Sequence, residues 1–423
     1  MTTQPGSLIL FDYSETLRYN FLRQTKLTSR LKRRFIIKAS NILIYNAVVY
    51  TPEAVLPQGW LLTEGEKIAQ IGSGEPPAIE AAFRIDAAGK TLLPGFIDVH
   101  IHGSIGVDSM DADPAGLLKI AQYLPSHGVT GFLPTTWAAS HADILAAIQT
   151  IKTAMQTGPQ TGAEILGAHM EGPYLNPQRC GAQDLSQIRR ANLKELGECL
   201  DSGIVRLIAL APEFEENQAA IQECVRRGVT VSAGHTAATY EQMKQAVAFG
   251  VSHTTHTFNA MTPLSHRNVG TVGAALALDE LYCEAICDTI HVEPPALKIL
   301  ARAKGPDKVI IVTDCIRGTG LPDGEYKADH RTMIIKDGAA RLSNGTLMGS
   351  TSSIDNGLKN MVAASGFELS QAWKMSSLNA AKSIHVDDRK GSLTAGKEAD
   401  LVLIDREFKV HCTIARGQVA YQA

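Results

Sequence analysis

The feature that most constrains the fold of this chain is a regular alternation of short apolar runs and helical stretches through its middle. Amphipathic segments such as 143–156, 217–227, 240–249 and 294–303 separate the apolar runs. Strands that alternate with helices in this way form parallel sheets. Eight such strands over about 290 residues suit a (β/α)8 TIM barrel, which we expect across residues 96–385. The predicted strands are 96–102, 129–136, 164–171, 204–211, 229–235, 251–257, 283–291 and 308–314.

Potential metal ligands occupy the ends of these predicted strands. In a TIM barrel the catalytic groups lie at the C-terminal ends of the strands. Residues two apart in a strand share a face, so His100 and His102 present two imidazoles side by side. Later runs end in Glu171, His235, His256, His291 and Asp314.

This set of side chains predicts a metal centre at the barrel mouth. Nitrogen and oxygen ligands without a thiolate suit zinc, iron, manganese or cobalt, and composition does not choose among them. We expect one or two divalent ions, zinc first, with Glu171 bridging two. Each histidine taken alone is more simply a hydrogen-bonded core residue, and only their joint placement favours ligation. The predicted ligands are His100, His102, Glu171, His235, His256 and Asp314.

Two other histidines lie near these ligands in the sequence. His253 precedes His256 by three positions and faces the other way in a regular strand, so we expect a structural role. His169 shares a face with Glu171 but sits deeper, so we expect it behind the ligands or in the core.

Asp314 is the candidate general base. Metal-activated hydrolysis needs a group that takes a proton from water and returns it to the leaving group. A carboxylate beside a dication stays ionised and can accept that proton at neutral pH. The competing interpretation is that Asp314 caps the following helix.

The segments on either side of the barrel have the pattern of short strands. They are 42–45, 47–50, 60–62 and 67–71, followed by a tail from 400 to 419. Neither segment is long enough to enclose a core. We therefore expect one small β-sandwich built from both chain ends, residues 38–95 and 386–423. Residues 1–37 are basic; we expect a poorly ordered extension, with a basic arm or targeting peptide as the alternative, and assign it no function.

Composition excludes several classes of partner. The 423 residues carry a formal net charge of −3, which gives no reason to expect nucleic acid or an anionic membrane. No apolar run approaches the roughly 20 residues that span a bilayer. The seven cysteines show no CxxC pairing, so reduced thiols in a cytoplasmic protein are the simplest expectation.

Several motifs carry a resemblance that covers the chain from about residue 42 onward. They are PGFIDVHIHG (94–103), GAHMEGPYLNP (167–177), SAGHT (232–236), THTFNAM (255–261), TD (313–314), LSNGTLMGS (342–350) and GSLTAGKEADLVLID (391–405). With them the sequence resembles the amidohydrolase superfamily and, within it, the N-acetylglucosamine-6-phosphate deacetylase family. The EGP-x-x-NP and FNAM segments are more specific than the HxH pair, which the whole superfamily shares.

The resemblance implies a metal-dependent hydrolase of amino-sugar catabolism. Its substrate would be N-acetyl-D-glucosamine 6-phosphate and its products D-glucosamine 6-phosphate and acetate. Glu171, His235 and His256 would bind the primary metal, and Asp314 would act as base and then as acid. Because His100 and His102 are intact, we expect a second ion.

The resemblance also implies substrate contacts. Arg267 suits phosphate because its planar guanidinium matches phosphate oxygens, although an exposed solubilising arginine is the alternative. In the family its loop can reach the neighbouring subunit, which implies a homodimer. The implied contacts are Ala182, Gln183, Asn259, Ala260, His266, Arg267, Asp288, Thr289, Ile290, His291, Leu347, Met348 and Gly349.

Some positions depart from the family pattern. Asn268 and Val269 replace a common Glu-Pro, Thr289 replaces glycine, and Cys315 replaces a frequent alanine. These changes bear on sugar specificity, so N-acetylgalactosamine 6-phosphate is an alternative substrate. A cyclic amide or nucleobase hydrolase is a second alternative. A non-catalytic scaffold is the third, disfavoured because the ligands and the base are all present.

Overall fold

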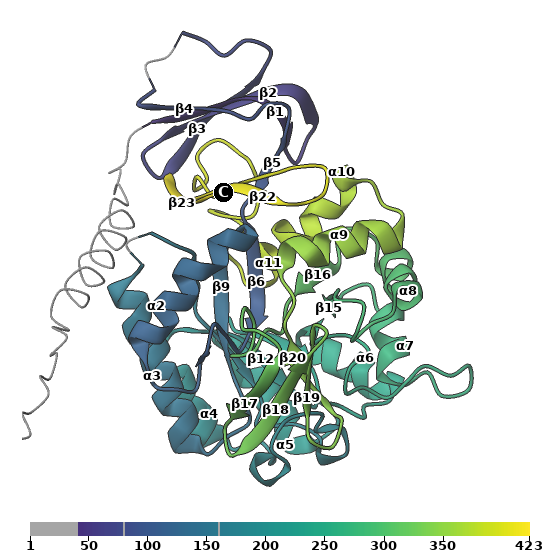
Figure 1. Ribbon diagram of the computed structural model, residues 1–423. Helices are drawn as coiled ribbons and strands as arrows, with labels where there is room; N and C mark the ends of the chain where they lie inside the picture. Colours follow the sequence, from purple (N-terminus) through teal and green to yellow (C-terminus); the bar gives the residue numbers. More distant parts are fainter. Residues whose placement is uncertain (1–40, 79–80, 160) are drawn as a thin grey trace, which may run out of the picture. The chain divides into compact units, whose positions relative to one another are not determined.

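Parallel strands form the core of the structure, a computed structural model that describes residues 41–78, 81–159 and 161–423. The extension expected at 1–37 lies outside these residues. The barrel strands are β6 (Phe96–Ile101), β9 (Val129–Thr136), β10 (Glu164–Ile165), β11 (Ala168–Glu171), β12 (Val205–Leu210), β13 (Thr230–Ala233), β14 (Val251–Thr254), β15 (Tyr282–Ile286) and β16 (Val309–Val312). The parallel order is β6, β9, β11, β12, β13, β14, β15 and β16, and β10 continues into β11 beside β9. Figure 1 labels β6, β9, β12, β15 and β16 among them. Every predicted run overlaps a barrel strand, and the TIM-barrel prediction is confirmed.

The barrel closes between its last and first strands, where candidate ligands also lie. The Asp314 backbone N–H donates to the His100 carbonyl at 2.9 Å. Ile101 and Cys315 form a parallel bridge one residue farther along. Closure therefore brings two chain segments that carry candidate site residues side by side.

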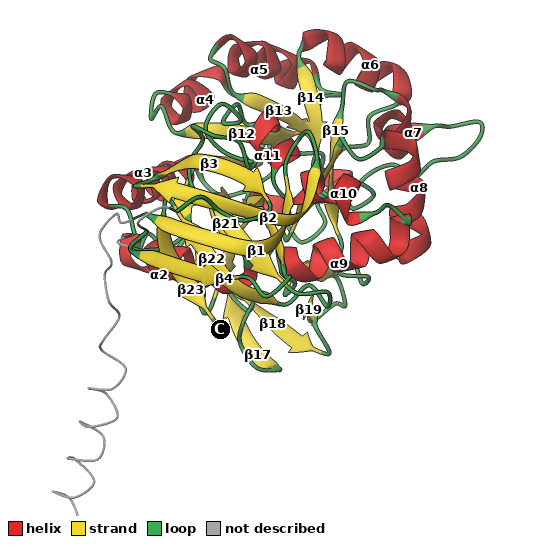
Figure 2. Cartoon of the chain, turned by 90° about the horizontal axis from the view of Figure 1, so that it is seen from above, coloured by secondary structure: helices red, strands yellow, loops and turns green. Residues whose placement is uncertain are grey.

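Most helices surround the strands, as Figure 2 shows from above, whereas α11 lies in the middle of that view and packs on interior residues of the barrel such as Ile97 and Leu133. They are α2 (Pro114–Tyr123), α3 (His141–Thr157), α4 (Leu193–Leu200), α5 (Glu215–Arg226), α6 (Tyr240–Phe249), α7 (Gly270–Ala277), α8 (Pro294–Lys304), α9 (Ile354–Ser365), α10 (Leu369–Ala372) and α11 (Leu378–Ser383). Local sequence explains their limits: α6 starts at a capping box of Thr239 with Gln242 and ends at Gly250, whose φ is 110°. Among the described residues, none of the helices combines the length and the apolar character that crossing a bilayer demands.

A second sheet combines strands from both ends of the described chain. Its strands are β1 (Ile42–Tyr50), β2 (Val55–Glu64), β3 (Lys67–Ser73), β4 (Phe83–Asp86), β5 (Thr91–Pro94), β21 (Leu401–Ile404), β22 (Val410–Ala415) and β23 (Gln418–Gln422). The order β23-β22-β21-β5-β1-β2-β3, with β4 beside β1, joins both halves through β5 and β21. The strands predicted at 42–45 and 47–50 are one strand with a register irregularity, where Asn46 has a φ of 55°. The prediction of one small β-domain from both ends is confirmed.

Short antiparallel strands that the sequence pattern did not reveal follow the last barrel strand. They are β17 (Gly324–Ala328), β18 (Arg331–Lys336), β19 (Ala339–Leu342) and β20 (Leu347–Ser350). A smaller hairpin of β7 (Gly103–Ser104) and β8 (Val107–Asp108) follows β6. Strand β20 pairs with Cys315 through Ser350, which brings it beside the C-terminal end of β16.

Candidate metal centre and active site

Six predicted ligands lie together at the carboxyl ends of the barrel strands and form what we call the mouth cluster. All six are buried. They divide into two groups, and within each group the candidate ligand atoms lie within 4.8 Å of one another. The first group is His100, His102 and Asp314, and the second is Glu171, His235 and His256.

Backbone turns, rather than regular strand, present half of the mouth cluster. His235, His256 and Asp314 each follow the last residue of their strand by two positions and have φ values of 47°, 30° and 50°. Non-glycine residues rarely adopt positive φ, and such residues concentrate at functional sites. The predicted strands therefore extended too far at these three ends. The seventh extended farthest, because β15 stops at Ile286, five residues before His291.

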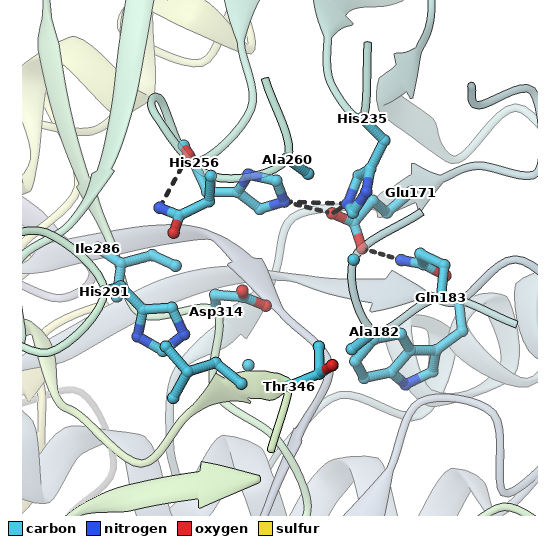
Figure 3. A pocket seen from close by; sticks show the side chains of 15 residues that line it. Glu171, Ala182, Gln183, His235, His256, Ala260, Ile286, His291, Asp314 and Thr346 are labelled. Carbon is cyan, nitrogen blue, oxygen red and sulfur yellow. Dashed lines mark hydrogen bonds and ion pairs between the residues drawn. The ribbon is translucent and has the colours of Figure 1, made fainter. Parts of the chain in front are cut away.

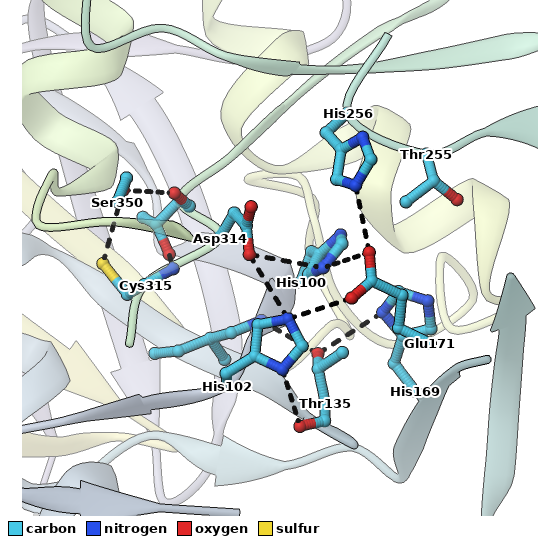
Figure 4. Close-up of polar contacts among 12 residues, drawn as sticks. His100, His102, Thr135, His169, Glu171, Thr255, His256, Asp314, Cys315 and Ser350 are labelled. Carbon is cyan, nitrogen blue, oxygen red and sulfur yellow. Dashed lines mark hydrogen bonds and ion pairs between the residues drawn. The ribbon is translucent and has the colours of Figure 1, made fainter. Parts of the chain in front are cut away.

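The two histidines of the first group face the carboxylates of Glu171 and Asp314 (Figure 4). His100 Nε2 lies 3.5 Å from Glu171 Oε1 and 3.5 Å from Asp314 Oδ1. His102 Nε2 lies 3.2 Å from Glu171 Oε2 and 3.3 Å from Asp314 Oδ1. The two imidazoles share a face, as their spacing predicted.

The two histidines of the second group meet at Oε1 of the same glutamate (Figure 3). Glu171 Oε1 lies 3.1 Å from His235 Nε2 and 3.0 Å from His256 Nε2. The two imidazole nitrogens are 3.1 Å apart. Glu171 thus touches both groups, as expected of a residue that can bridge two ions.

The donor set fits a divalent cation. His100 Nε2 and His102 Nε2 are buried and have no hydrogen-bond partner among the described residues. His235 Nδ1 lies 2.8 Å from the Arg179 carbonyl, which places the proton of a neutral His235 ring on Nδ1 and leaves its Nε2 lone pair facing His256 and Glu171. Nitrogen and carboxylate ligands of this kind are those of catalytic zinc and similar metals.

The electrostatics of the site keep its acids ionised. Burial by itself raises the pKa of Glu171 and Asp314. Neighbouring imidazoles, His100 foremost, outweigh the effect of burial and hold the pKa of both carboxyls below the usual range. Both side chains are therefore available as anionic ligands or proton acceptors at neutral pH.

A cavity of about 150 Å³ opens onto the mouth cluster. Four ligands contribute to its wall: Glu171, His235, His256 and Asp314. Seven of the residues expected to contact substrate line it as well, namely Ala182, Gln183, Asn259, Ala260, His291, Leu347 and Gly349.

The fold and this geometry agree with comparisons to known proteins. The model of the amidohydrolase family matches residues 91–420. The chain belongs to the amidohydrolase family.

Two curated relatives show how far the likeness extends. This amidohydrolase is 36% identical over 388 residues to N-acetylglucosamine-6-phosphate deacetylase of Bacillus subtilis (strain 168), covering 90% of this chain and 98% of that protein. It is also 36% identical over 367 residues to N-acetylgalactosamine-6-phosphate deacetylase of Escherichia coli O157:H7, covering 86% and 96%.

A solved structure supports the same relationship. A mutant of N-acetyl-D-glucosamine-6-phosphate deacetylase from Mycobacterium smegmatis, in complex with N-acetyl-D-glucosamine-6-phosphate, has a TM-score of 0.84 and 30% identity. The match covers 90% of this chain and 100% of that one.

Six residues expected to contact substrate do not line the cavity. Met348 is buried among Ile316, Met333 and Ile335, because alternation along β20 turns it away from the face of Leu347 and Gly349. His266 and Arg267 are exposed on the loop before α7, which projects from the barrel in both views (Figures 1 and 2).

The remaining three belong to the turn that holds His291. Asp288 accepts hydrogen bonds from the backbone N–H groups of Ile290 and His291, both at 2.8 Å, and from His291 Nδ1 at 2.7 Å. Thr289 lies between them with a φ of 67°, a conformation that β-branched residues rarely adopt. In the single chain these residues orient His291 and do not line the cavity.

Two residues beside the ligands were missed by the sequence analysis. The Trp137 indole stacks on His102, with ring centroids 3.7 Å apart, and its Nε1–H donates to Asp108 Oδ2. Glu284 in β15 contacts His100 Nδ1 at 3.0 Å. A carboxylate inside an otherwise apolar run was the available signal for Glu284, since buried acids need partners.

The two histidines set apart by the sequence analysis lie behind the ligands. The His169 ring packs edge-on against His100, with centroids 4.6 Å apart, and its Nδ1 lies 3.3 Å from Thr135 Oγ1. His253 is fully buried, with its Nε2 4.0 Å from Glu284 Oε1. Neither belongs to a ligand group.

Proposed function

We propose that this amidohydrolase hydrolyses N-acetyl-D-glucosamine 6-phosphate to D-glucosamine 6-phosphate and acetate, a reaction of amino-sugar breakdown. The observation that carries the proposal is a cavity lined by Asp314 of the first ligand group and by Glu171, His235 and His256 of the second. The likeness to deacetylases of this sugar phosphate over nearly their whole length supports it.

We assign acid–base catalysis to Asp314. Its carboxylate is held ionised beside His100 and His102 and borders the cavity, so it can accept a proton from the attacking water. Returned to the nitrogen as the C–N bond breaks, the same proton lets the sugar leave as a neutral amine. His291, held by Asp288, lines the same cavity and can donate a hydrogen bond to the substrate.

We assign two divalent ions to the mouth cluster, with zinc as the first candidate and iron, manganese or cobalt as alternatives. Bound there, such an ion supplies a Lewis acid that polarises the acetyl carbonyl and activates water. His100, His102 and Asp314 would hold one ion; Glu171, His235 and His256 would hold the other. The unpartnered imidazole nitrogens support this assignment.

We also propose that the active enzyme is a homodimer. His266 and Arg267 are exposed outside the cavity of their own chain, yet a guanidinium is suited to the phosphate that the substrate carries. A loop that projects from the barrel can bring both residues to a second copy. Ala182, Gln183, Asn259, Ala260, Asp288, Thr289, Ile290, His291, Leu347, Met348 and Gly349 complete the proposed substrate site.

Two further assignments remain proposals. The free cysteines of the described chain support a cytoplasmic location, where thiols stay reduced. The sheet that combines both chain ends supports a division into residues 38–95, 96–385 and 386–423.

The function is tested by acetate release together with elemental analysis. Purified protein should contain divalent metal and release acetate from N-acetylglucosamine 6-phosphate, and removal of the metal should stop the release. Undiminished hydrolysis after exhaustive chelation, or no hydrolysis by the metal-loaded protein, would contradict the proposal.

N-acetylgalactosamine 6-phosphate is the second candidate substrate. The deacetylase of this sugar from Escherichia coli O157:H7 shares 36% identity with the chain, the same figure as the Bacillus subtilis relative. The two sugars differ only at one hydroxyl, which fine pocket geometry must distinguish. Parallel kcat/KM measurements on both should favour the glucosamine derivative, and a large preference for the other epimer would reverse the assignment.

A further inference from the structure

Glu284 is a fully buried carboxylate that contacts both ligand groups without lining the cavity. Its Oε2 lies 3.0 Å from His100 Nδ1 and accepts the backbone N–H of His256, also at 3.0 Å. His100 belongs to the first group and His256 to the second. One oxygen atom therefore connects the two halves of the mouth cluster.

This contact sets the tautomer of His100. An ionised carboxylate only accepts hydrogen bonds, so the proton of the neutral ring lies on Nδ1 and the lone pair on Nε2. Nε2 is the atom that faces Glu171 and Asp314. A carboxylate in this position also makes the imidazole a more basic ligand.

The other three imidazoles of the mouth cluster have no such carboxylate. His102 Nδ1 lies 3.2 Å from the Thr135 carbonyl, and His235 Nδ1 lies 2.8 Å from the Arg179 carbonyl. His256 Nδ1 is buried with no partner among the described residues. Of the four Nδ1 atoms, that of His100 alone contacts a carboxylate, and the carboxylate belongs to Glu284.

Glu284 also holds the turn that presents His256. The φ of His256 is 30°, a conformation that needs support from its surroundings. The carboxylate of Glu284 accepts the N–H of His256, and the backbone carbonyl of Glu284 accepts the N–H of Thr257 at 2.8 Å. Loss of the carboxylate removes one of these two bonds.

We propose that Glu284 is a positioning residue that sets the metal affinity of the first group through its charge and supports the second group through the backbone of His256. The inference rests on the proposed metal centre but is independent of which substrate is hydrolysed. It separates two properties of one side chain, its charge and its ability to accept hydrogen bonds.

Glu284→Gln isolates the charge. The glutamine oxygen can keep both hydrogen bonds of Oε2, and its NH2 group would take the place of Oε1. Oε1 has no hydrogen-bond partner, and the unpartnered His253 Nε2 lies 4.0 Å from it, so the new NH2 group replaces an atom that makes no hydrogen bond. Glu284→Leu removes both properties at similar volume.

The experiment is a titration of full-length apo-protein with Zn²⁺ and with Co²⁺, followed by calorimetry and by Co²⁺ absorption. Wild-type protein should bind two ions. Glu284→Gln should bind one ion normally and the other about 10–100-fold more weakly. Glu284→Leu should weaken both. Anomalous scattering from Glu284→Gln crystals at limiting Zn²⁺ should show that the zinc missing from this variant is the ion at His100, His102 and Asp314.

Cys283→Ser is the matched control, because Cys283 is the preceding residue of β15 and its Sγ donates to the Ala275 carbonyl of α7. It should bind both ions as wild type does. Two ions bound with wild-type affinity by both Glu284 variants, or one ion only by the wild type, would overturn the inference. Inactivity toward N-acetylglucosamine 6-phosphate with this binding pattern intact would instead refute the proposed function alone.

Discussion

Two glutamates in one predicted strand, Glu164 and Glu171, belong to ionisable clusters of opposite character. Glu171, at the carboxyl end, lies in the mouth cluster, where imidazole nitrogens lack hydrogen-bond partners. Glu164, at the amino end, lies in a second cluster, which we call the Lys390 cluster. It consists of Glu164, Arg389, Lys390, Glu398 and Asp400.

The Lys390 cluster is complete in itself. Lys390 Nζ is fully buried and contacts Glu164 at 2.9 Å, Glu398 at 2.7 Å and Asp400 at 2.5 Å. Burial raises the pKa of Glu164, but Lys390 and Arg389 lower it to about 2. Every charge therefore has an opposite charge from the protein, whereas the mouth cluster needs a cation from solution. Buried charge alone does not indicate a site; buried charge without a partner does.

The largest effect should follow from Asp314→Asn. An amide cannot accept the proton, so kcat should fall about 10²–10⁴-fold if Asp314 is the general base. The metal held by Glu171, His235 and His256 should remain, as elemental analysis can check. Asp307→Asn is the control, because this exposed residue lies at the other end of β16. Full activity of Asp314→Asn would show that the mouth cluster has another base.

Lys390→Met should lower the free energy of unfolding by about 3–5 kcal/mol, because buried carboxylates lose their cation. Denaturant unfolding measures the loss, and the activity of the folded fraction should not change. Lys374→Met breaks a more exposed pair with Asp307 and should cost about 0–1 kcal/mol. Equal losses of unfolding free energy in both lysine variants would mean that the burial of Lys390 does not make its ion pairs more important for stability than the exposed pair.

Removal of metal should lower the free energy of unfolding through the mouth cluster alone. At a free metal concentration 100 times Kd, binding contributes about 2.7 kcal/mol per site, provided that the unfolded chain does not bind. Thermal unfolding with and without chelator should show the same metal-dependent stabilisation in wild type and in Lys390→Met, since the two clusters share no residue. A metal-dependent stabilisation that disappears in Lys390→Met would show that the clusters are coupled.

Sequence reasoning was most successful where hydrophobic periodicity decides the outcome. The barrel strands are short and buried on both faces, so they are nearly continuous apolar runs. The sheet β17–β20 was missed because its strands mix exposed and buried residues, as in the Arg331–Lys336 strand, and lack such runs.

The gathering of these side chains at the candidate site was predictable, but the backbone that presents them was not. Strand parity and strand ends led to His100, His102 and Glu171, whose grouping follows from barrel geometry. The positive φ of His235, His256 and Asp314 cannot be inferred from residue type, so the strand ends were set too late. Side-chain partners far apart in sequence, such as Glu284 with His100, depend on how neighbouring elements pack.

The pairing of β5 with β21 imposes an order on biosynthesis. Leu92 lies opposite Leu403, and all of the barrel is encoded between these residues. A nascent chain can thus form its first strands early but must leave one edge of β5 without its neighbour until the ribosome has translated the entire catalytic portion. During that interval the unpaired edge is a place where chaperones or aggregation can act.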